Sequence, residues 1–306
     1  MTETMFELSQ GAHEDGSPGS VVRFHGDTVT LEVRHCDDYD AALEGEGELG
    51  RWVGDALAQA LSKGSPTTVE VQIRPDYSGE LFRGWLADLL TEKLPSSVRS
   101  LAWGVLDGFR HSPSSSLGFC FVELPDCSAL FSKLDLETLR LQGEWHEENA
   151  ELSTEGVRHL GLAALSVDAL EALDELDLDG IAHLELWLYD HENEGADLLG
   201  IDDLDSLLAR ELPALRALTI HGCEFGPELI EALPEAGFFE HLESLSLLGA
   251  TIEGSFLDES CAEALLSEAF AEVATIDVSG SFSTPGREPT PLLERLVEES
   301  GGRIRG

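Results

Sequence analysis

The sequence predicts an α/β solenoid, in which short parallel strands alternate with helices and successive units stack on one another. One observation is a ladder of apolar residues that recurs along much of the chain. A second is the apolar spacing after each ladder, which changes from two to about 3.6 residues, as expected for a strand followed by a helix. A third is the length of 306 residues, which a repeat array reaches without dividing because each unit packs on its neighbours.

The clearest ladder is LRALTIHGCEF, whose middle part alternates between apolar and polar residues as a short strand does. The next unit, LESLSLLGATI, fills the same five positions 27 residues further along. The two sets are Leu215, Leu218, Ile220, Cys223 and Phe225, and then Leu242, Leu245, Leu247, Ala250 and Ile252. Shorter copies are VATIDV at 273–278, IAHLEL at 181–186, VRHLGL at 157–162, LETLRL at 136–141 and VRSLAW at 98–103. Each copy predicts one strand.

Two degenerate strands are expected ahead of these copies. TVTLEV at 28–33 and TTVEVQI at 67–73 alternate as strands do but lack the full ladder. The sequence therefore predicts about nine strands. The spacing between successive ladders, from VRSLAW onward, varies from 21 to 38 residues, so the array is irregular.

Helices are expected between the strands. In SGELFRGWLADLLTEKLP, Ser78 can cap a helix whose apolar stripe is Leu81, Trp85 and Leu89, with Leu94 as a further member, and Pro95 ends it. Pro227 after Gly226 and Pro291 after Thr290 stand where a first helical residue is expected. The remaining tryptophans in or near these elements, Trp52 on a helix and Trp103 on a strand, are expected in the core together with Trp85.

The L-x-x-L-x-L-x-x-C-x-L ladder is the pattern of a leucine-rich repeat. The later units resemble repeats of the ribonuclease-inhibitor-like type, and the segment 181–254 looks like a signature block of an uncharacterised bacterial leucine-rich repeat family. The resemblance implies a horseshoe with a curved parallel sheet on the concave face and helices on the convex face. It implies no activity and no catalytic residues. We expect a flexible segment at 1–20 and one leucine-rich repeat domain at 21–306, with degenerate N-terminal repeats.

The charge limits the classes of partner. Sixty acidic residues against 18 basic ones give a net charge of −42, which repels nucleic acid and anionic membranes and attracts basic proteins. The same charge can serve solubility alone, and we favour that reading. Five cysteines without framework spacing, a first segment unlike a signal peptide and the lack of a membrane-length apolar run predict a cytoplasmic protein.

Alternation predicts which side chains lie on the concave face. The position between two core residues of each strand is occupied by Glu32, Glu70, Ala102, Arg140, Gly161, Glu185, Thr219, Ser246 and Asp277. Trp187 is also expected there, exposed as an apolar anchor for a partner. The alternative is a local bulge that turns Trp187 into the core. The predicted contact residues on this face are Arg140, Glu185, Trp187, Thr219, His221 and Ser246.

An acidic loop follows the strand of Trp187. Tyr189, Asp190, Glu192 and Glu194 are expected along the rim beside the concave face, where carboxylates would steer a basic partner. The loop also resembles the start of a calcium-binding loop, but Ile201 stands at the twelfth position, where a bidentate glutamate belongs. A solvated acidic loop without metal is therefore favoured. The acidic runs at 37–48, 144–151 and 190–205 are interpreted as solvated connections.

No catalytic constellation stands out. His221 near Cys223 and His35 beside Cys36 invite a zinc or nucleophile reading, but Cys223 fills a small core position of the repeat. No nucleotide, hydrolase or zinc-protease motif is present, so we expect no enzyme, metal or cofactor. The expected function is a scaffold that binds another protein. Basic proteins are among the candidate partners. Alternatives are an acidic inhibitor of a basic protein such as a nuclease, and an accessory subunit that holds a substrate for an enzyme.

Overall fold

The structure is a computed structural model of the chain. It describes residues 5–9, 20–33, 48–73, 85–105, 126–142, 152–163, 170, 173–188, 200–222, 225–248, 259–279, 281 and 291–306. The fold is α/β, with a mostly parallel arrangement of strands and with helices in the connections.

The chain divides into two compact units. Unit 1 comprises Met1–Arg110 with Leu117–Val157, and unit 2 comprises His111–Ser116 with Arg158–Gly306. A repeat array lends itself to such a division, because each strand and helix contacts mainly the elements next to it in the chain.

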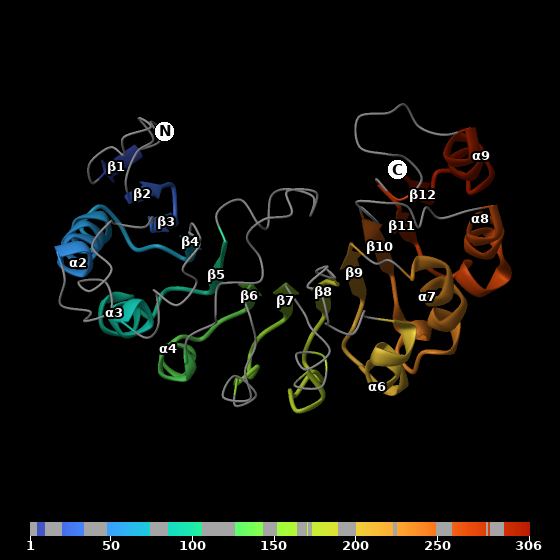
Figure 1. Ribbon diagram of the computed structural model, residues 1–306, viewed down its shortest axis with the longest axis horizontal. Helices are drawn as coiled ribbons and strands as arrows, with labels where there is room; N and C mark the ends of the chain where they lie inside the picture. The colour runs from blue at the N-terminus through green and yellow to red at the C-terminus, as the bar shows by residue number, and fades with distance from the viewer. Residues whose placement is uncertain are drawn as a thin grey trace, which may run out of the picture. The chain divides into compact units, whose positions relative to one another are not determined.

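Unit 1 contains six strands and three helices among its described residues. They are β1 (Met5–Ser9), β2 (Val21–His25), β3 (Thr28–Val33), α2 (Glu48–Leu61), β4 (Thr68–Ile73), α3 (Trp85–Lys93), β5 (Ser100–Val105), α4 (Ser128–Lys133) and β6 (Thr138–Gln142). The strands lie in chain order. β1, β2 and β3 pair antiparallel, and β3 to β6 pair parallel. The three helices lie on one side of the strands (Figure 1).

Unit 2 also has six described strands, and all of them pair parallel in chain order. The strands are β7 (His159–Ala163), β8 (His183–Trp187), β9 (Ala217–His221), β10 (Ser244–Leu248), β11 (Thr275–Asp277) and β12 (Ile304–Arg305). The α-helices are α6 (Asp205–Ala209), α7 (Gly226–Ala232), α8 (Glu259–Leu266) and α9 (Pro291–Glu299). Short 3-10 turns are η3 (Ile201–Leu204), η4 (Leu233–Glu235), η5 (Phe239–His241) and η6 (Glu268–Phe270).

The apolar ladder forms the core of each unit. In unit 2 the second ladder positions are register partners on neighbouring strands, and none is more than 2% exposed. These residues are Leu160, Leu184, Leu218, Leu245 and Ile276. Unit 1 has the same row in Val29, Val69, Leu101 and Leu139, all fully buried. All nine strands expected from the sequence are confirmed.

The proline-led helices also form as expected. Pro227 stands in the first turn of α7, which buries Leu229 and Ile230, and α9 begins at Pro291 and buries Leu296. Proline suits a first turn because its missing N–H has no helical acceptor there.

The stripe predicted for the helix before Pro95 is wrong by one residue. α3 buries Leu86 and Leu90, whereas Trp85 and Leu89 are only partly buried. Both sets keep a spacing of four, so periodicity alone could not choose between them. Trp103 is fully buried as expected, but Trp52 is only partly buried. Ser78 and Leu81 lie outside the described residues.

Three strands were not predicted. β1 lies within the segment 1–20 that was expected to be flexible, and it pairs with β2. β2 and β3 form a tight hairpin, in which Gly26 has a φ of 63° and Asp27 completes the turn. β12 adds two residues beside β11. No helix of the described residues has the length and apolar character needed to cross a membrane.

Two arginines bind main-chain carbonyls of the preceding repeat. Arg210 donates to the carbonyl oxygens of Leu173 and Leu176 at 3.1 and 2.8 Å. Arg303 donates to those of Phe270 and Leu265 at 2.8 and 3.0 Å. Each arginine thus gives a charged donor to two main-chain carbonyls, of which those of Leu173 and Phe270 also accept a main-chain N–H from Leu176 and Val273.

Candidate functional site

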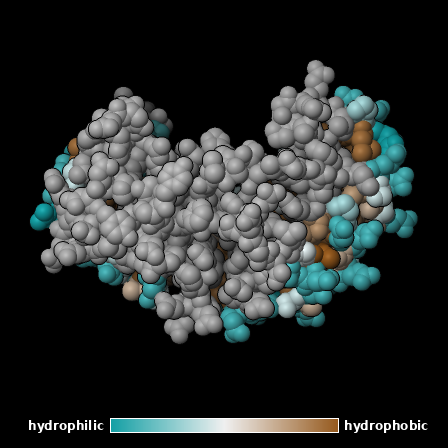
Figure 2. Space-filling model, viewed as in Figure 1, coloured by the Kyte–Doolittle hydropathy of each residue, from teal (hydrophilic) through white to brown (hydrophobic). Residues whose placement is uncertain are grey.

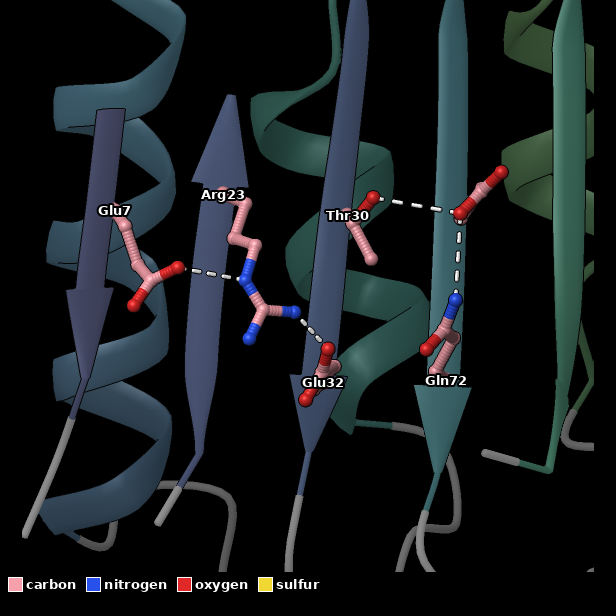
Figure 3. A network of polar contacts seen from close by, with 6 residues as sticks. Glu7, Arg23, Thr30, Glu32 and Gln72 are labelled. Carbon is pink, nitrogen blue, oxygen red and sulfur yellow. Dashed lines mark hydrogen bonds and ion pairs between the residues drawn. The ribbon is translucent and has the colours of Figure 1, made fainter. Parts of the chain in front are cut away.

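Each strand has one face that carries no helix among the described residues. Figure 3 shows this for unit 1, where the drawn side chains stand on the near side of the strands and the helices lie behind. In unit 2, Leu184 and Leu186 of β8 point into the core, so alternation places His183, Glu185 and Trp187 on the opposite side. We call this side the helix-free face.

A group of polar and aromatic side chains covers the helix-free face of β7, β8 and β9. We call it the histidine cluster, and its members are His159, His183, Glu185, Trp187, Thr219 and His221. The carboxylate of Glu185 lies between two imidazoles. Its Oε2 is 3.1 Å from Nε2 of His159, and its Oε1 is 3.2 Å from Nε2 of His221.

Two ring stacks complete the cluster. The rings of His159 and His183 have centroids 4.1 Å apart and planes inclined by 16°. The rings of Trp187 and His221 have centroids 4.2 Å apart and planes inclined by 1°. Nε2 of His183 lies 2.9 Å from the hydroxyl of Thr219. Hydrogen bonds and stacks thus join all six side chains.

The strand register explains this geometry. His159 pairs with His183, and Trp187 pairs with His221, so both stacks join direct cross-strand neighbours. Glu185 pairs with Gly161 on one side and Thr219 on the other. It reaches both histidines diagonally, and Gly161 presents no side chain beside it.

Glu185 is a buried carboxylate, with its side chain only 7% exposed. A buried carboxylate is costly unless hydrogen-bond donors surround it. Neutral imidazoles satisfy it when the Nε2 of His159 and of His221 each carry the proton and donate it. The two histidine side chains remain 25% and 18% exposed, so the cluster stays in contact with solvent through its imidazoles.

The predicted anchor Trp187 lies on the expected face of the sheet, but its side chain is buried and not exposed as predicted. It keeps the strand alternation, so no bulge turns it into the core, yet it is only 5% exposed. The stack on His221 covers one side of the indole. Trp187 is therefore a buried member of the cluster and not an exposed anchor.

The other predicted contact residues divide into three sets. Glu185, Thr219 and His221 lie in the cluster, and Ser246 continues the row next to Thr219 on β10. Arg140 is partly buried on β6 of unit 1. Tyr189, Asp190, Glu192 and Glu194 lie outside the described residues, as do Cys223, His35 and Cys36.

The sequence reading missed His159 and His183. Each stands directly before the second core residue of its ladder, in VRHLGL and IAHLEL. Alternation assigns both to the face of Glu185, so the signal was present in two equivalent positions of neighbouring repeats.

Unit 1 carries a second polar network on its helix-free face (Figure 3). Nε of Arg23 donates to Glu7 at 2.7 Å, and a terminal nitrogen of Arg23 donates to Glu32. Glu32 is 8% exposed, so unit 1 also compensates a buried carboxylate on this face.

One predicted position in the row of unit 1 is displaced. The register places Thr30, not Glu32, beside Glu70 and Ala102. Both residues lie on the helix-free face, but they stand two residues apart along β3. The Thr30 hydroxyl donates to Glu70 at 3.4 Å, and Gln72 donates to the same oxygen at 3.3 Å.

The described residues contain no group of three or more histidine, cysteine, aspartate or glutamate side chains arranged to hold a metal ion. The Asp190–Asp197 part of the acidic loop is outside the described residues, and Asp203 accepts a hydrogen bond from the Gly200 N–H at 2.7 Å. Cys127 and Cys261 are buried and form no disulfide.

Exposed carboxylates lie on the helices and in the turns that connect helices to strands. In unit 2 the exposed acidic residues of α8 and α9 are Glu259, Glu263, Glu294, Glu298 and Glu299. Hydrophilic side chains gather over these helices in Figure 2. The helix-free face differs, because its described carboxylates in unit 2 are Glu185 and Asp277. Histidines and Thr219 surround Glu185, and Ser246 and Arg305 flank Asp277.

Comparison with known proteins gives the fold alone. No protein-family model matches the sequence. No curated protein matches it. A crystal structure of a protein from Bacteroides fragilis is similar over 99% of this chain and 95% of its own, with a TM-score of 0.59 and 15% sequence identity. At that identity the similarity supports the α/β arrangement of repeated strands and helices and says nothing of activity.

Proposed function

We propose that this protein is a non-catalytic scaffold that binds another protein through the helix-free face of unit 2. The observation that carries the proposal is the histidine cluster, in which hydrogen bonds and stacks hold six side chains on a sheet. Side chains that are already ordered lose little entropy when a partner docks, so more of the contact energy contributes to affinity.

We further propose that the repeated units are leucine-rich repeats in a horseshoe. Leucine or a similar residue fills the second ladder position of every parallel strand from β3 to β11. The similarity to the Bacteroides fragilis structure over nearly the whole chain agrees with a continuous repeat array. Such arrays bind proteins through the side chains that vary between fixed core positions.

The accessible part of the proposed surface is polar. His159, His183, His221 and Ser246 are each partly exposed, and Asp277 follows Ser246 in the same row. The buried Glu185, Thr219 and Trp187 would then support this surface from below. A partner rich in hydrogen-bonding groups fits it better than an apolar helix, which would leave the imidazoles and hydroxyls without water.

A second candidate is an acidic inhibitor of a basic protein. The net charge of −42 and the exposed carboxylates on the helices favour it. A third candidate is an accessory subunit that holds a substrate protein for an enzyme on the same helix-free face.

Two serine-to-arginine variants test the location of binding. Ser246→Arg places a long cation on the helix-free face, and Ser206→Arg places the same cation on the exposed side of α6. We expect Ser246→Arg to reduce capture of the natural partner from native cell extract at least tenfold, and Ser206→Arg to leave capture unchanged. Equal capture by both variants would refute binding at this face.

Ionic strength separates the candidates. Attraction between the acidic surface and a basic protein weakens steeply as salt rises, because added ions screen exposed charges. Docking on the hydrogen-bonding face of the cluster should depend weakly on salt. If about 0.5 M salt releases the partner equally from both serine variants, the result supports the acidic inhibitor over the scaffold.

A further inference from the structure

Glu185 determines which nitrogen of each neighbouring imidazole carries a proton. A carboxylate only accepts hydrogen bonds, so Nε2 of His159 and Nε2 of His221 are the donors across 3.1 and 3.2 Å. In the neutral ring this leaves Nδ1 as a hydrogen-bond acceptor. A carboxylate that accepts one ring proton also makes the opposite nitrogen of the ring a stronger acceptor.

Both Nδ1 atoms are open to a group from outside the chain. The ring of His159 bonds Glu185 and stacks on His183, and the ring of His221 bonds Glu185 and stacks on Trp187. Within the described residues neither Nδ1 has a hydrogen-bond partner, and neither is one of the buried side-chain atoms that lack a partner. The two histidine side chains are 25% and 18% exposed, so a donor in solution can reach them.

The acceptors favour a partner group that carries N–H donors. Ser246 adds a partly exposed hydroxyl on the neighbouring strand β10, and the chain has a net charge of −42, which attracts cations. Arginine has five N–H donors, no acceptor and a flat group that keeps its charge. A charged donor forms a stronger bond than a neutral one. Lysine is more strongly hydrated, so it gains less at a partly buried acceptor.

We propose that the histidine cluster is a binding site for arginine side chains of the partner, which donate to Nδ1 of His159 and of His221. This inference rests on the proposed function for the existence of a partner, and it adds the chemical group that the partner brings to the helix-free face. Glu185 is then a positioning residue, because it holds both imidazoles in the tautomer that accepts from the partner.

Nuclear magnetic resonance of the histidine rings tests the tautomer. In protein that contains isotope-labelled histidine, the ring nitrogens show which atom carries the proton. At pH 8 we expect a proton on Nε2 and none on Nδ1 in both His159 and His221, with His159→Gln and His221→Gln used to assign the signals. A proton on Nδ1 of either ring would overturn the proposal.

N-acetyl-arginine amide is the probe for binding, and N-acetyl-citrulline amide is its uncharged control of nearly the same shape. We expect the arginine probe to shift the Nδ1 signals of His159 and His221 with a dissociation constant on the order of 10 mM, as suits one charged hydrogen bond. The citrulline probe should bind about tenfold more weakly. His241, an exposed histidine on η5 outside the cluster, should respond to neither probe.

The outcomes separate this proposal from the proposed function. Equal shifts with both probes, an equal shift at His241, or no shift with about 50 mM of the arginine probe would each overturn the arginine site. The proposed function is tested by capture with Ser246→Arg and Ser206→Arg. If capture depends on Ser246 while the arginine probe gives no shift, the proposed function stands and the arginine site is refuted.

Discussion

The indole of Trp187 stacks on the imidazole of His221 across neighbouring strands, with ring centroids 4.2 Å apart and planes inclined by only 1°. The same imidazole lies 3.2 Å from the buried carboxylate of Glu185. Trp187 thus belongs to the packed structure of unit 2, although it lies on the side of the sheet that has no described helix. Its removal should affect stability before it affects any binding.

Trp187→Ala should lower the free energy of unfolding by about 3 kcal/mol, as expected when a buried aromatic side chain is removed. Urea unfolding followed by circular dichroism measures this loss. Trp52→Ala is a suitable comparison, because Trp52 is only partly buried on α2 and should cost less. Equal losses in the two variants would contradict the buried position of Trp187.

A double-mutant cycle on Glu185 and His221 should give a coupling energy of about 1 kcal/mol at pH 7. The reason is that the bond joins a side chain only 7% exposed to one 18% exposed. Glu240 and His241 form a matched control, since their side chains are 80% and 45% exposed at 3.5 Å. Solvent screens that pair, so its coupling should be close to zero. The idea fails if the two pairs couple equally.

Arg210→Gln should destabilise the fold by about 2 kcal/mol, because two buried main-chain carbonyl groups lose a charged donor. Thermal and urea unfolding both report this change. Arg158→Gln removes an exposed arginine and should stay within about 0.5 kcal/mol of the parent. A similar loss in both variants would mean that net charge, and not the carbonyl bonds, determines the effect.

Cys127 should resist alkylation in the folded protein. Burial, with a smaller contribution from Asp126, raises the pKa of the Cys127 thiol from 9.0 to about 12. At pH 8 the thiolate that reacts with iodoacetamide is therefore scarce. Mass spectrometry of the peptide that contains Cys127 should show labelling in urea and almost none in buffer. Labelling at equal rates in both conditions would contradict the buried thiol.

The same thiol has a defined effect on the pH dependence of stability. Its pKa is higher in the folded protein than in the unfolded chain, so the folded state binds the proton more tightly. The resulting stability is fully present below pH 9 and is lost as pH rises toward 12. Replacing Cys127 with Ala should flatten the stability curve over that range without changing its shape below pH 8.

The strands of the ladder could be predicted because one property, a buried apolar residue at alternate positions, recurs along the chain. β1 and β2 could not be found that way, since they are an antiparallel addition without the ladder. A different signal was available for the hairpin. Gly26 and Asp27 stand between two alternating runs, and a glycine with positive φ suits such a two-residue turn.

The sequence predicted which side chains of the candidate site share one face of the sheet. It did not predict their burial or their contacts. Alternation placed Glu185, Thr219 and His221 on one face, as the register has them. The burial of Trp187 depends on which ring stands beside it on the next strand, and a single strand contains no such information. The alignment of His159 with His183 likewise becomes visible only when two repeats are paired.

The arginines bound to carbonyls set a limit on how acidic this chain can become by substitution. Arg210 and Arg303 each use both terminal nitrogens, and the two nitrogens reach carbonyl oxygens of different residues. Lysine presents a single nitrogen, so it would not reproduce the two separate N–H bonds that the planar guanidinium directs at these acceptors. Evolution could therefore exchange solvent-facing cations freely, but these two positions should retain arginine in any descendant that keeps the fold.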